Sequence, residues 1–546
     1  RPGAGRGATP APGLRPPRGS MLAPTSRGPP ETGPAVTSET SAAHARTTET
    51  PTMPATGPVE IALTPGDGIG PEIMDACLRI FEAAGVMEHC SFIECAAGEK
   101  VFAAGDSRGL TDETLETIER TGLVFKGPMG TPVGGGGKSI NVTLRKTFGA
   151  FANLRHFQSL PGVDTVFSRA GVPVDIYVVR ENIEDTYGGI EYRMTDDVIE
   201  CKRLISAPGC DQVSRFAFET AKRLGITSVR CGHKANIMKL TDGLFLSRFH
   251  QIARDYPDIE AGDVIIDALC MNLVLKPQEY QMIVLPNLQG DIVSDLAAGL
   301  VGGLGFAPSA NIGDRVSIFE AVHGTAPDIA GKGVANPTSL LFSGLLLLRH
   351  IGMLRQAAVI ENALLRTLED GIRTGDFSGD REPVGTTAFA DAIIERLGSE
   401  PGEPKEVPDE SVPGYRPMPR PEVNLRMTTH SGLNEHVVGT DIFIDADLAP
   451  LELARRLQTI CEHTPFELTM MSNRGTQVWP TGSVYTELVD HVRCRFELRD
   501  KSMIGRIGQA ATIHLLERLG EKLTLIEWRP LKEYDGRPGF SLAQGQ

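Results

Sequence analysis

A set of polar side chains in the first third of the chain has the types and spacing to bind a multiply charged carboxylate. Ser139, Asn141 and Arg145 place a hydroxyl, an amide and a guanidinium at positions i, i+2 and i+6, and Arg155 and Arg180 follow. A guanidinium holds a carboxylate through two parallel hydrogen bonds, so three converging arginines match three carboxylates. The pattern predicts a tricarboxylic acid site. Taken singly, each arginine is better explained as a surface ion pair.

Three acids further along the chain could hold a divalent cation. Asp291 and Asp295 are four residues apart, so a helix would project both from one face, and Asp267 lies near the end of an expected strand at 264–266. Carboxylate oxygens suit Mg²⁺ or Mn²⁺. Without other ligands, acids at this spacing are usually solvated helix residues.

Lys234 and Tyr187 are candidates for proton transfer. A lysine between a metal and other cations loses its proton easily and acts as a base, and a tyrosine beside it can deliver a proton to a carbanion. The simpler alternatives are a surface lysine and a half-buried core tyrosine.

Residues 323–337 are rich in small residues and turn formers, as in a loop that wraps an adenosine. The carboxylate of Asp328 would accept hydrogen bonds from ribose hydroxyls and repel a 2′-phosphate, which favours NAD over NADP. The glycines at 66, 68 and 70 follow a strand and open a helix, but the full dinucleotide spacing is absent. A tight strand-to-helix turn is therefore favoured over a Rossmann loop.

Strand-like and helix-like runs alternate from residue 59 onward and predict an α/β architecture with a substantial sheet. A helix is expected from residue 71 to residue 84, and the apolar run 340–348 is expected to be a buried helix. The expected strands are 61–63, 123–125, 175–179, 228–231, 264–266 and 282–285.

The proline-rich segment 401–433 predicts a semi-rigid linker between a catalytic domain at 58–400 and a small C-terminal α+β domain at 434–546. In the second domain we expect strands at 437–444, 466–471 and 523–528, and helices at 451–461 and 507–519. Residues 1–57 are expected to be a disordered leader because they are rich in proline and glycine.

The composition narrows the class of protein. A net charge of -15 argues against nucleic-acid and membrane-surface partners. Nine scattered cysteines without a CxxC pair indicate reduced thiols rather than a disulfide framework. We expect a cytoplasmic protein, or a mitochondrial matrix protein if residues 1–57 are a transit peptide.

Residues 59–398 resemble the β-decarboxylating dehydrogenases, the isocitrate and 3-isopropylmalate dehydrogenase family, most specifically in the runs Gly290–Gly305 and His323–Gly331. The resemblance implies the non-Rossmann fold of that family. Ser139, Asn141 and Arg145 are similar to the isocitrate-binding members, and the leucine-rich sequence that would receive an isopropyl group is missing. The expected reaction is oxidative decarboxylation of isocitrate to 2-oxoglutarate and CO₂, a step of the tricarboxylic acid cycle. Homoisocitrate and 3-isopropylmalate remain alternative substrates.

The resemblance also implies residue roles. Ser139 and Asn141 would bond the γ-carboxylate, and Arg145, Arg155 and Arg180 would hold the substrate carboxylates. Mg²⁺ or Mn²⁺ would lie between Asp291, Asp295 and Asp267 of the partner subunit. Lys234 of the partner subunit would help to deprotonate the hydroxyl, and Tyr187 would protonate the enol carbon. Such sharing implies a homodimer or a higher homo-oligomer.

For the cofactor, NADP-dependent relatives are similar in having lysine and tyrosine at the positions of Asp328 and Ile329, so the resemblance implies NAD. The implied cofactor-binding residues are Lys126, Thr131, Asn236, His323, Gly324, Asp328, Ile329, Ala335 and Asn336. Two positions depart from the family pattern: His156 stands where proline is usual, and Gly130 where threonine is common.

Two further expectations follow. The C-terminal module is similar to an extension of longer bacterial-type isocitrate dehydrogenases, where it contributes to assembly. The alternative to an enzyme is a non-catalytic regulatory subunit, but such subunits typically lose the tyrosine, the lysine or the metal acids that are present here.

Overall fold

The structure is a computed structural model that describes residues 57–106, 108–130, 139–409, 433–482 and 485–542. The predicted leader up to residue 56, Thr131 and most of the predicted linker at 401–433 therefore lie outside the described residues. No helix in the described ranges is long and apolar enough to cross a membrane.

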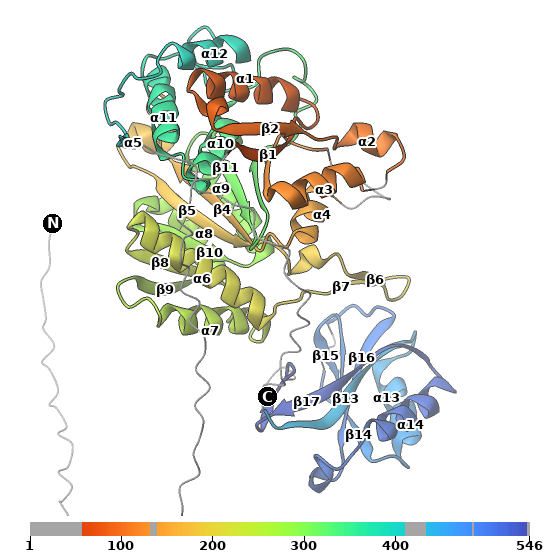
Figure 1. Ribbon diagram of the computed structural model, residues 1–546. Coiled ribbons are helices and arrows are strands. Elements are labelled where there is room, and N and C mark those ends of the chain that lie inside the picture. The colour runs from red at the N-terminus through yellow and green to blue at the C-terminus, as the bar shows by residue number, and fades with distance from the viewer. Residues whose placement is uncertain (1–56, 107, 131–138, 410–432, 483–484, 543–546) are drawn as a thin grey trace, which may run out of the picture. The chain divides into compact units, whose positions relative to one another are not determined.

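A ten-stranded mixed sheet forms the centre of the first domain (Figure 1), in the order β2-β1-β3-β12-β11-β4-β5-β10-β8-β9. The outer strands on each side run parallel to their neighbours, whereas the β12–β11, β11–β4 and β4–β5 pairs are antiparallel. The strands are β1 (Val59–Thr64), β2 (Cys90–Glu94), β3 (Leu123–Lys126), β4 (Ala152–Gln158), β5 (Asp175–Glu181), β8 (Ser228–His233), β9 (Glu260–Ile265), β10 (Met282–Leu285), β11 (Pro308–Ile312) and β12 (Ser317–Ala321).

Helices cover both faces of this sheet. They are α1 (Gly70–Ala83), α2 (Glu99–Ala103), α3 (Asp112–Thr121), α4 (Ile140–Thr147), α5 (Val166–Ala170), α6 (Ala207–Leu224), α7 (Thr241–Ala253), α8 (Ile266–Leu275), α9 (Asn287–Leu300), α10 (Thr338–His350), α11 (Leu354–Glu369) and α12 (Thr386–Ile394). A separate two-stranded sheet pairs β6 (Glu191–Arg193) with β7 (Ile199–Cys201).

The two faces of the sheet differ in how their apolar side chains are distributed. One face contributes to a single large core with α1, α6, α7, α10, α11 and α12. On the opposite face the apolar residues form two separate clusters, one against α3 and α4 and the other against α8 and α9. Because side chains alternate along a strand, the middle strands present polar residues to the gap between these clusters.

The glycine-rich turn between β1 and α1 is a close-packed backbone junction. Gly66 and Gly68 have φ values of 82° and 58°. A Cβ atom on Gly66 would lie 2.2 Å from the carbonyl oxygen of Pro128, and one on Gly68 would lie 2.0 Å from that of Thr325. These glycines therefore let three chain segments meet, as expected of a tight turn rather than a Rossmann loop.

The C-terminal domain is a six-stranded antiparallel sheet in the order β15-β14-β16-β13-β17-β18, with two helices packed on it. Its elements are β13 (Glu435–Asp445), α13 (Pro450–Cys461), β14 (Phe466–Asn473), β15 (Thr476–Trp479), β16 (His491–Leu498), α14 (Gln509–Gly520), β17 (Thr524–Tyr534) and β18 (Arg537–Pro538). The expected helices and strands of this α+β domain are present, and their ends agree within about two residues except that β17 continues to Tyr534, past the predicted end at residue 528.

The described start of the proline-rich segment packs along α11. Lys405 donates its backbone N–H to Asn362 over 2.7 Å, and the Asn362 amide donates to the Lys405 carbonyl over 2.9 Å. Gly402 donates to the carboxylate of Glu369, and Arg355 donates to the carbonyls of residues 408 and 409. Residues 402–409 are therefore held against the first domain.

Sequence patterns predicted some elements better than others. The expected strands in β1, β3, β5, β8 and β10 and the expected helices α1 and α10 are confirmed. The expected strand at 264–266 is displaced: β9 ends at Ile265, and Asp267 lies in the first turn of α8. Strands β2, β4, β6, β7, β11 and β12 of the first domain, and β15, β16 and β18 of the C-terminal domain, were not predicted.

All nine cysteines of the chain are described as free thiols. Seven are buried, Cys270 is half-buried and Cys201, at the end of β7, is exposed. Burial raises the pKa of Cys77, Cys90, Cys210 and Cys231 above that of an ordinary thiol. The expectation of scattered reduced thiols agrees with these positions.

Candidate active site

Strand register alone assembles a polar surface in the gap between the two apolar clusters. Glu320 on β12 pairs with Lys126 on β3 and with Ser309 on β11. Asn153 on β4 pairs with Arg180 on β5 and with Asn311 on β11. Directly paired residues share a face of the sheet, so two short rows of polar side chains lie side by side.

Glu320 is the buried anion of this surface. Its carboxylate lies 2.5 Å from the Lys126 ammonium and 2.8 Å from the Arg145 guanidinium on α4, and it accepts a 2.7 Å hydrogen bond from Asn311. Burial opposes ionisation of Glu320, but the two cations outweigh it and hold the pKa well below the ordinary value. Glu320 thus fixes Arg145 beside the sheet.

The hydrogen-bond partners that hold Arg155 on the same face are neutral. Its guanidinium donates to the Asn153 side chain over 2.8 Å and to the Ser294 hydroxyl over 2.6 Å. Burial, reinforced by repulsion from Arg180, lowers the pKa of Arg155 to about 10. An anion beside this guanidinium would offset both effects.

Arg180 passes along the first turn of α9. It donates to the backbone and side-chain oxygens of Asn287 over 2.8–3.1 Å and to the carboxylate of Asp291. A Cβ atom on Gly290 would lie 2.5 Å from the Arg180 side chain. Gly290 is therefore needed for this close approach, since any larger residue would displace Arg180.

The two acids of α9 lie beside these arginines. The Arg155 guanidinium is 3.7 Å from Asp291 and 3.6 Å from Asp295. Burial would raise the pKa of Asp291, but Arg180 and its other partners lower it. Asp295 is more exposed, and burial raises its pKa despite the attraction of Arg155. The predicted shared helix face of the two acids is confirmed.

Tyr187 reaches the same carboxylate from a 3-10 turn at Thr186–Gly188. Its hydroxyl donates to Asp291, and its ring lies 4.8 Å from the Arg180 guanidinium carbon. Burial and the bond to Asp291 raise the pKa of Tyr187, so the phenol keeps its proton.

Lys234 and Asp267 form a separate pair. The Lys234 ammonium contacts the Asp267 carboxylate, whose side chain is 68% exposed. Within the described ranges, no group of three or more potential ligands that includes Asp267 and the α9 acids is assembled in one chain. In one chain, Asp267 and the two α9 acids thus belong to separate groups, and all three offer the oxygen donors that Mg²⁺ and Mn²⁺ prefer.

A cavity of about 280 Å³ lies against the polar rows, and Asn141, Arg145, Arg155, Glu320 and Gly130 are among the residues that line it. Three buried polar atoms at its edge have no hydrogen-bond partner within the part of the chain that the structure describes. They are Asn141 Oδ1, Arg145 Nε and His323 Nε2. Since buried polar atoms are normally paired, this cavity is equipped for a polar ligand.

A second cavity of about 590 Å³ shares His323 and Gly324 with the first. Ile69, Ile329, Val334 and Ala335 give it an apolar lining, and Asn336 and Asp376 add polar groups. The Asn336 amide donates to Asp376 over 3.0 Å. Burial lowers the pKa of His323, so its ring is neutral at pH 7. A flat aromatic ligand fits this chemistry.

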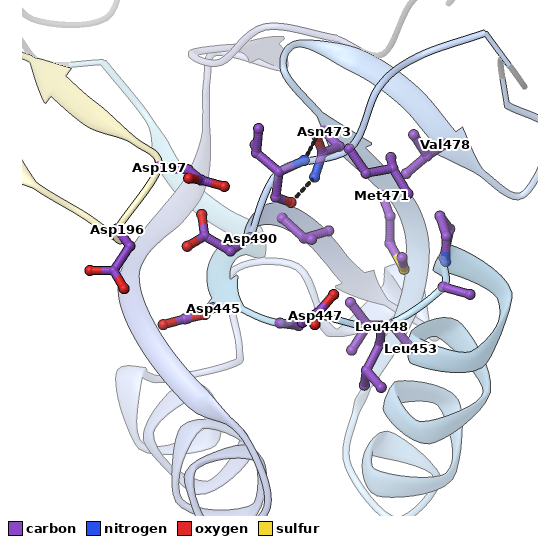
Figure 2. A pocket seen from close by; sticks show the side chains of 16 residues that line it. Asp196, Asp197, Asp445, Asp447, Leu448, Leu453, Met471, Asn473, Val478 and Asp490 are labelled. Carbon is purple, nitrogen blue, oxygen red and sulfur yellow. Dashed lines mark hydrogen bonds between the residues drawn. The ribbon is translucent and has the colours of Figure 1, made fainter.

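A third cavity, of about 570 Å³, involves the C-terminal domain. Figure 2 shows Asp445, Asp447 and Asp490 around it, with Met471 and Leu453 in its wall, and Asp196 and Asp197 also line it. None of the predicted site residues that the structure describes lies among its lining residues.

The structure brings most predicted site residues into two groups. Asn141, Arg145, Arg155, Arg180, Tyr187, Asp291 and Asp295 surround the smaller cavity or its arginines, with Lys126 behind Glu320 and Ser139 directly before α4. His323, Gly324, Ile329, Ala335 and Asn336 line the larger cavity, and Asp328 is exposed next to Ile329. Neither cavity is lined by Lys234, by Asp267 or by the exposed Asn236.

Sequence reasoning missed several residues that hold the site together. Glu320, Asn153, Ser294 and Asn287 each bond an arginine of the site. Glu320 comes three residues before His323, but nothing in a single sequence places it beside Arg145. Strand register places Glu320 beside Lys126, and helix α4 brings Arg145 to the same carboxylate.

The two departures from the family pattern have local explanations. His156 lies on β4, where its ring stacks on Tyr177 at 3.9 Å and its Nε2 lies 2.6 Å from Asp175. Gly130 donates its N–H to Asp67, and a Cβ atom there would lie 2.4 Å from the Glu99 carboxylate.

Comparisons with known proteins agree with this geometry. Residues 60–393 match the family model of isocitrate/isopropylmalate dehydrogenase, and residues 435–546 match that of the bacterial isocitrate dehydrogenase C-terminal domain. The chain is 45% identical to an isocitrate dehydrogenase [NADP] of Thermus thermophilus, over 89% of this chain and 96% of that protein. It is also 45% identical to an isocitrate dehydrogenase [NAD] catalytic subunit of Arabidopsis thaliana, over 63% of this chain and 89% of that protein. A crystal structure of the TT0538 protein from Thermus thermophilus superposes with a TM-score of 0.81 at 44% identity, over 89% of this chain and 96% of that chain.

Proposed function

Since the chain belongs to the isocitrate/isopropylmalate dehydrogenase family, we propose that it is an isocitrate dehydrogenase that uses NAD and Mg²⁺ or Mn²⁺. The observation that carries this proposal is the cavity lined by Asn141, Arg145 and Arg155, which adjoins the cavity behind His323. Its unpartnered polar atoms and cationic lining suit a small polycarboxylate. An isopropyl group would leave those polar atoms unpaired.

In this proposal the chain binds isocitrate through its guanidiniums. Arg145, Arg155 and Arg180 take the carboxylates, and Ser139 and Asn141 bond the γ-carboxylate. Glu320 and Asn153 keep Arg145 and Arg155 aimed at the cavity. Because these partners are already in place, little of the binding energy is used for ordering the side chains.

We assign each proton transfer of the proposed reaction to one residue. Lys234 accepts the proton of the substrate hydroxyl while the adjoining hydride leaves for the nicotinamide. The resulting β-keto acid loses CO₂, and Tyr187 returns one proton to the enol carbon. The overall conversion takes isocitrate and NAD to 2-oxoglutarate, CO₂ and NADH. A divalent cation held by Asp267, Asp291 and Asp295 would supply charge stabilisation at the substrate oxygens.

A second copy of the chain would complete the site. Asp267 and Lys234 stand apart from Asp291 in one chain, and apolar side chains are exposed on α8, on α9 and in the loop before α7 that carries Lys234. Ile237, Leu240, Met271, Val274, Leu275, Leu288 and Ile292 are all more than a third exposed. Exposed apolar side chains on several segments that carry site residues fit a subunit interface. We therefore assign it to a homodimer with shared sites.

The choice of NAD rests on Asp328 and Ile329. Asp328 is exposed beside the larger cavity, where a negative charge favours ribose hydroxyls and opposes a 2′-phosphate. The name of the Thermus relative carries NADP and that of the Arabidopsis relative carries NAD. The cofactor is thus a property to be measured on this chain.

The test is an initial-rate assay of the purified protein with Mg²⁺, supplied with isocitrate, homoisocitrate or 3-isopropylmalate, and with NAD or NADP. We expect reduction of NAD with isocitrate. Activity with NADP alone would support the proposed isocitrate dehydrogenase activity but would overturn the role of Asp328 in selecting NAD. Turnover of homoisocitrate or 3-isopropylmalate instead would identify that compound as the substrate. No turnover of any of the three would favour a regulatory subunit.

A further inference from the structure

Two buried carboxylates lie beneath the catalytic residues. The side chains of Asp185 and Asp242 are both 0% exposed, and no step of the proposed reaction uses either. Asp185 precedes the 3-10 turn that carries Tyr187. Asp242 lies at the start of α7, after the loop that carries Lys234. Burying two carboxylates is costly unless they are paired and hydrogen-bonded.

Arg203 pairs with both of them. Its Nε lies 2.5 Å from one Asp185 oxygen and its Nη2 lies 3.3 Å from the other, while its Nη1 donates to Asp242. The Arg203 side chain is only 16% exposed. A planar guanidinium can bridge two carboxylates in this way, whereas an ammonium cannot reach both with the same geometry.

Each carboxylate also holds a catalytic segment through the backbone. Asp185 accepts the N–H of Thr186 over 2.9 Å, directly before Tyr187. Asp242 accepts the N–H of Lys234 over 2.6 Å. Asp185 adopts a φ of 67°, a strained value for a residue other than glycine. The network therefore holds the Tyr187 turn in a conformation that the local sequence does not favour.

Both carboxylates reach α9 as well. Asp185 accepts the N–H of Leu288 over 3.1 Å, and Asp242 accepts the side-chain amide of Gln289 over 3.0 Å. These residues lie in the helical turn before Asp291. One guanidinium thus ties together the segments that carry the tyrosine, the lysine and the metal acids.

We propose that Arg203 is a positioning residue that couples the two shared sites of a homodimer. This inference rests on the proposed function, in which Tyr187 serves the site of its own chain and Lys234 serves that of the partner. The Asp185–Arg203–Asp242 network then joins half of one site to half of the other. A displacement at either carboxylate is transmitted to both sites.

The first test is Arg203→Lys, which keeps the charge but loses the double bridge. We expect kcat to fall about ten- to a hundredfold, because small misplacements of reacting groups are costly. KM for isocitrate should stay within about threefold, because the substrate arginines are untouched. Arg203→Met should lose more activity. Arg215→Lys, in an exposed pair with Asp255, is the matched control. A wild-type kcat in Arg203→Lys would overturn the proposal.

The second test uses mixed dimers that carry two different affinity tags. A Tyr187→Phe chain paired with a Lys234→Met chain retains one intact site, and its activity reports that site alone. Failure to recover activity would overturn the shared site itself, which separates this outcome from a failure of Arg203.

Arg203→Lys is then placed in one chain or the other of the mixed dimer. Coupling predicts a loss of activity from either chain: through Lys234 in the first and through Tyr187 in the second. A loss from the Lys234→Met chain only would reduce Arg203 to a local support of the Tyr187 turn and overturn the coupling.

Discussion

Asp328 and Ile329 give the chain a testable cofactor preference at the scale of single residues. Ile329 lines the larger cavity, and Asp328 adds a negative charge next to it. We expect Asp328→Lys with Ile329→Tyr to shift the ratio of kcat/KM for NADP over NAD upward by at least tenfold, or about 1.4 kcal/mol. Initial rates with both cofactors measure the ratio. An unchanged ratio would mean that the adenosine is bound elsewhere.

Tyr187 permits a second prediction. Its hydroxyl keeps its proton, because burial and Asp291 raise the pKa, and it is therefore suited to act as an acid. Tyr187→Phe should lower kcat by about 10²–10⁴-fold, the usual contribution of a positioned acid. KM for isocitrate should change little because the arginines remain. The exchange of the C3 hydrogens of 2-oxoglutarate with solvent should slow in parallel, and normal exchange would assign the proton to another group.

At the scale of elements, Glu320 on β12 links sheet stability to pH. Folding lowers the pKa of Glu320. Its ionised carboxylate therefore adds to the free energy of unfolding at pH values above 4.5, the ordinary pKa, and this added stability is lost as the pH falls below 4.5. Glu320→Gln leaves Lys126 and Arg145 buried without their anion, and should lower the free energy of unfolding by about 3–5 kcal/mol at pH 7.

Denaturant titrations at several pH values measure this effect, which should shrink below pH 4.5. Glu60→Gln is the control, because the Glu60–Arg120 pair is about half exposed and should contribute at most about 1 kcal/mol. Equal losses in the two variants would contradict the buried role of Glu320.

The helices and the strands of the site were not equally predictable. The four-residue spacing of Asp291 and Asp295 predicted their shared helix face, because one helix fixes that geometry. The strands β4, β11 and β12 place Asn, Arg, Ser and Glu among their apolar residues, so no long apolar run marked them. The pairing of Glu320 with Lys126 depends on register between strands far apart in sequence, which local pattern does not encode.

At the scale of the whole molecule, the position at which the C-terminal domain is removed should decide stability. A chain that ends at Asp409 keeps the bonds between residues 402–409 and α11, whereas one that ends at Gly398 loses them and exposes the Asn362 amide to water. We expect the shorter chain to be less stable by about 1–3 kcal/mol. Thermal unfolding of both chains measures the difference.

Sedimentation of the same two chains tests the predicted assembly role of the C-terminal domain. A chain ending at Asp409 that keeps the oligomeric state of the full protein would assign assembly to the first domain alone, where the apolar surface of α8 and α9 lies.

Sequence alone pointed to a site shared between copies only through family resemblance. The separation of Asp267 from the α9 acids is a matter of three-dimensional distance, and no spacing along the chain reveals it. In one chain the Lys234–Asp267 pair lies apart from the residues that line the arginine cavity.

Because the cysteines differ in exposure, the native sequence offers a single site for a spectroscopic label. Cys201 is the one exposed thiol among the nine, so a maleimide spin label should react there first and leave the buried thiols unmodified. Each copy would then carry a single probe at the edge of the β6–β7 ribbon. If two copies pair symmetrically, electron–electron dipolar spectroscopy of the native sequence would return one sharp distance. Binding of isocitrate could then be followed as a change in that distance, without a single mutation.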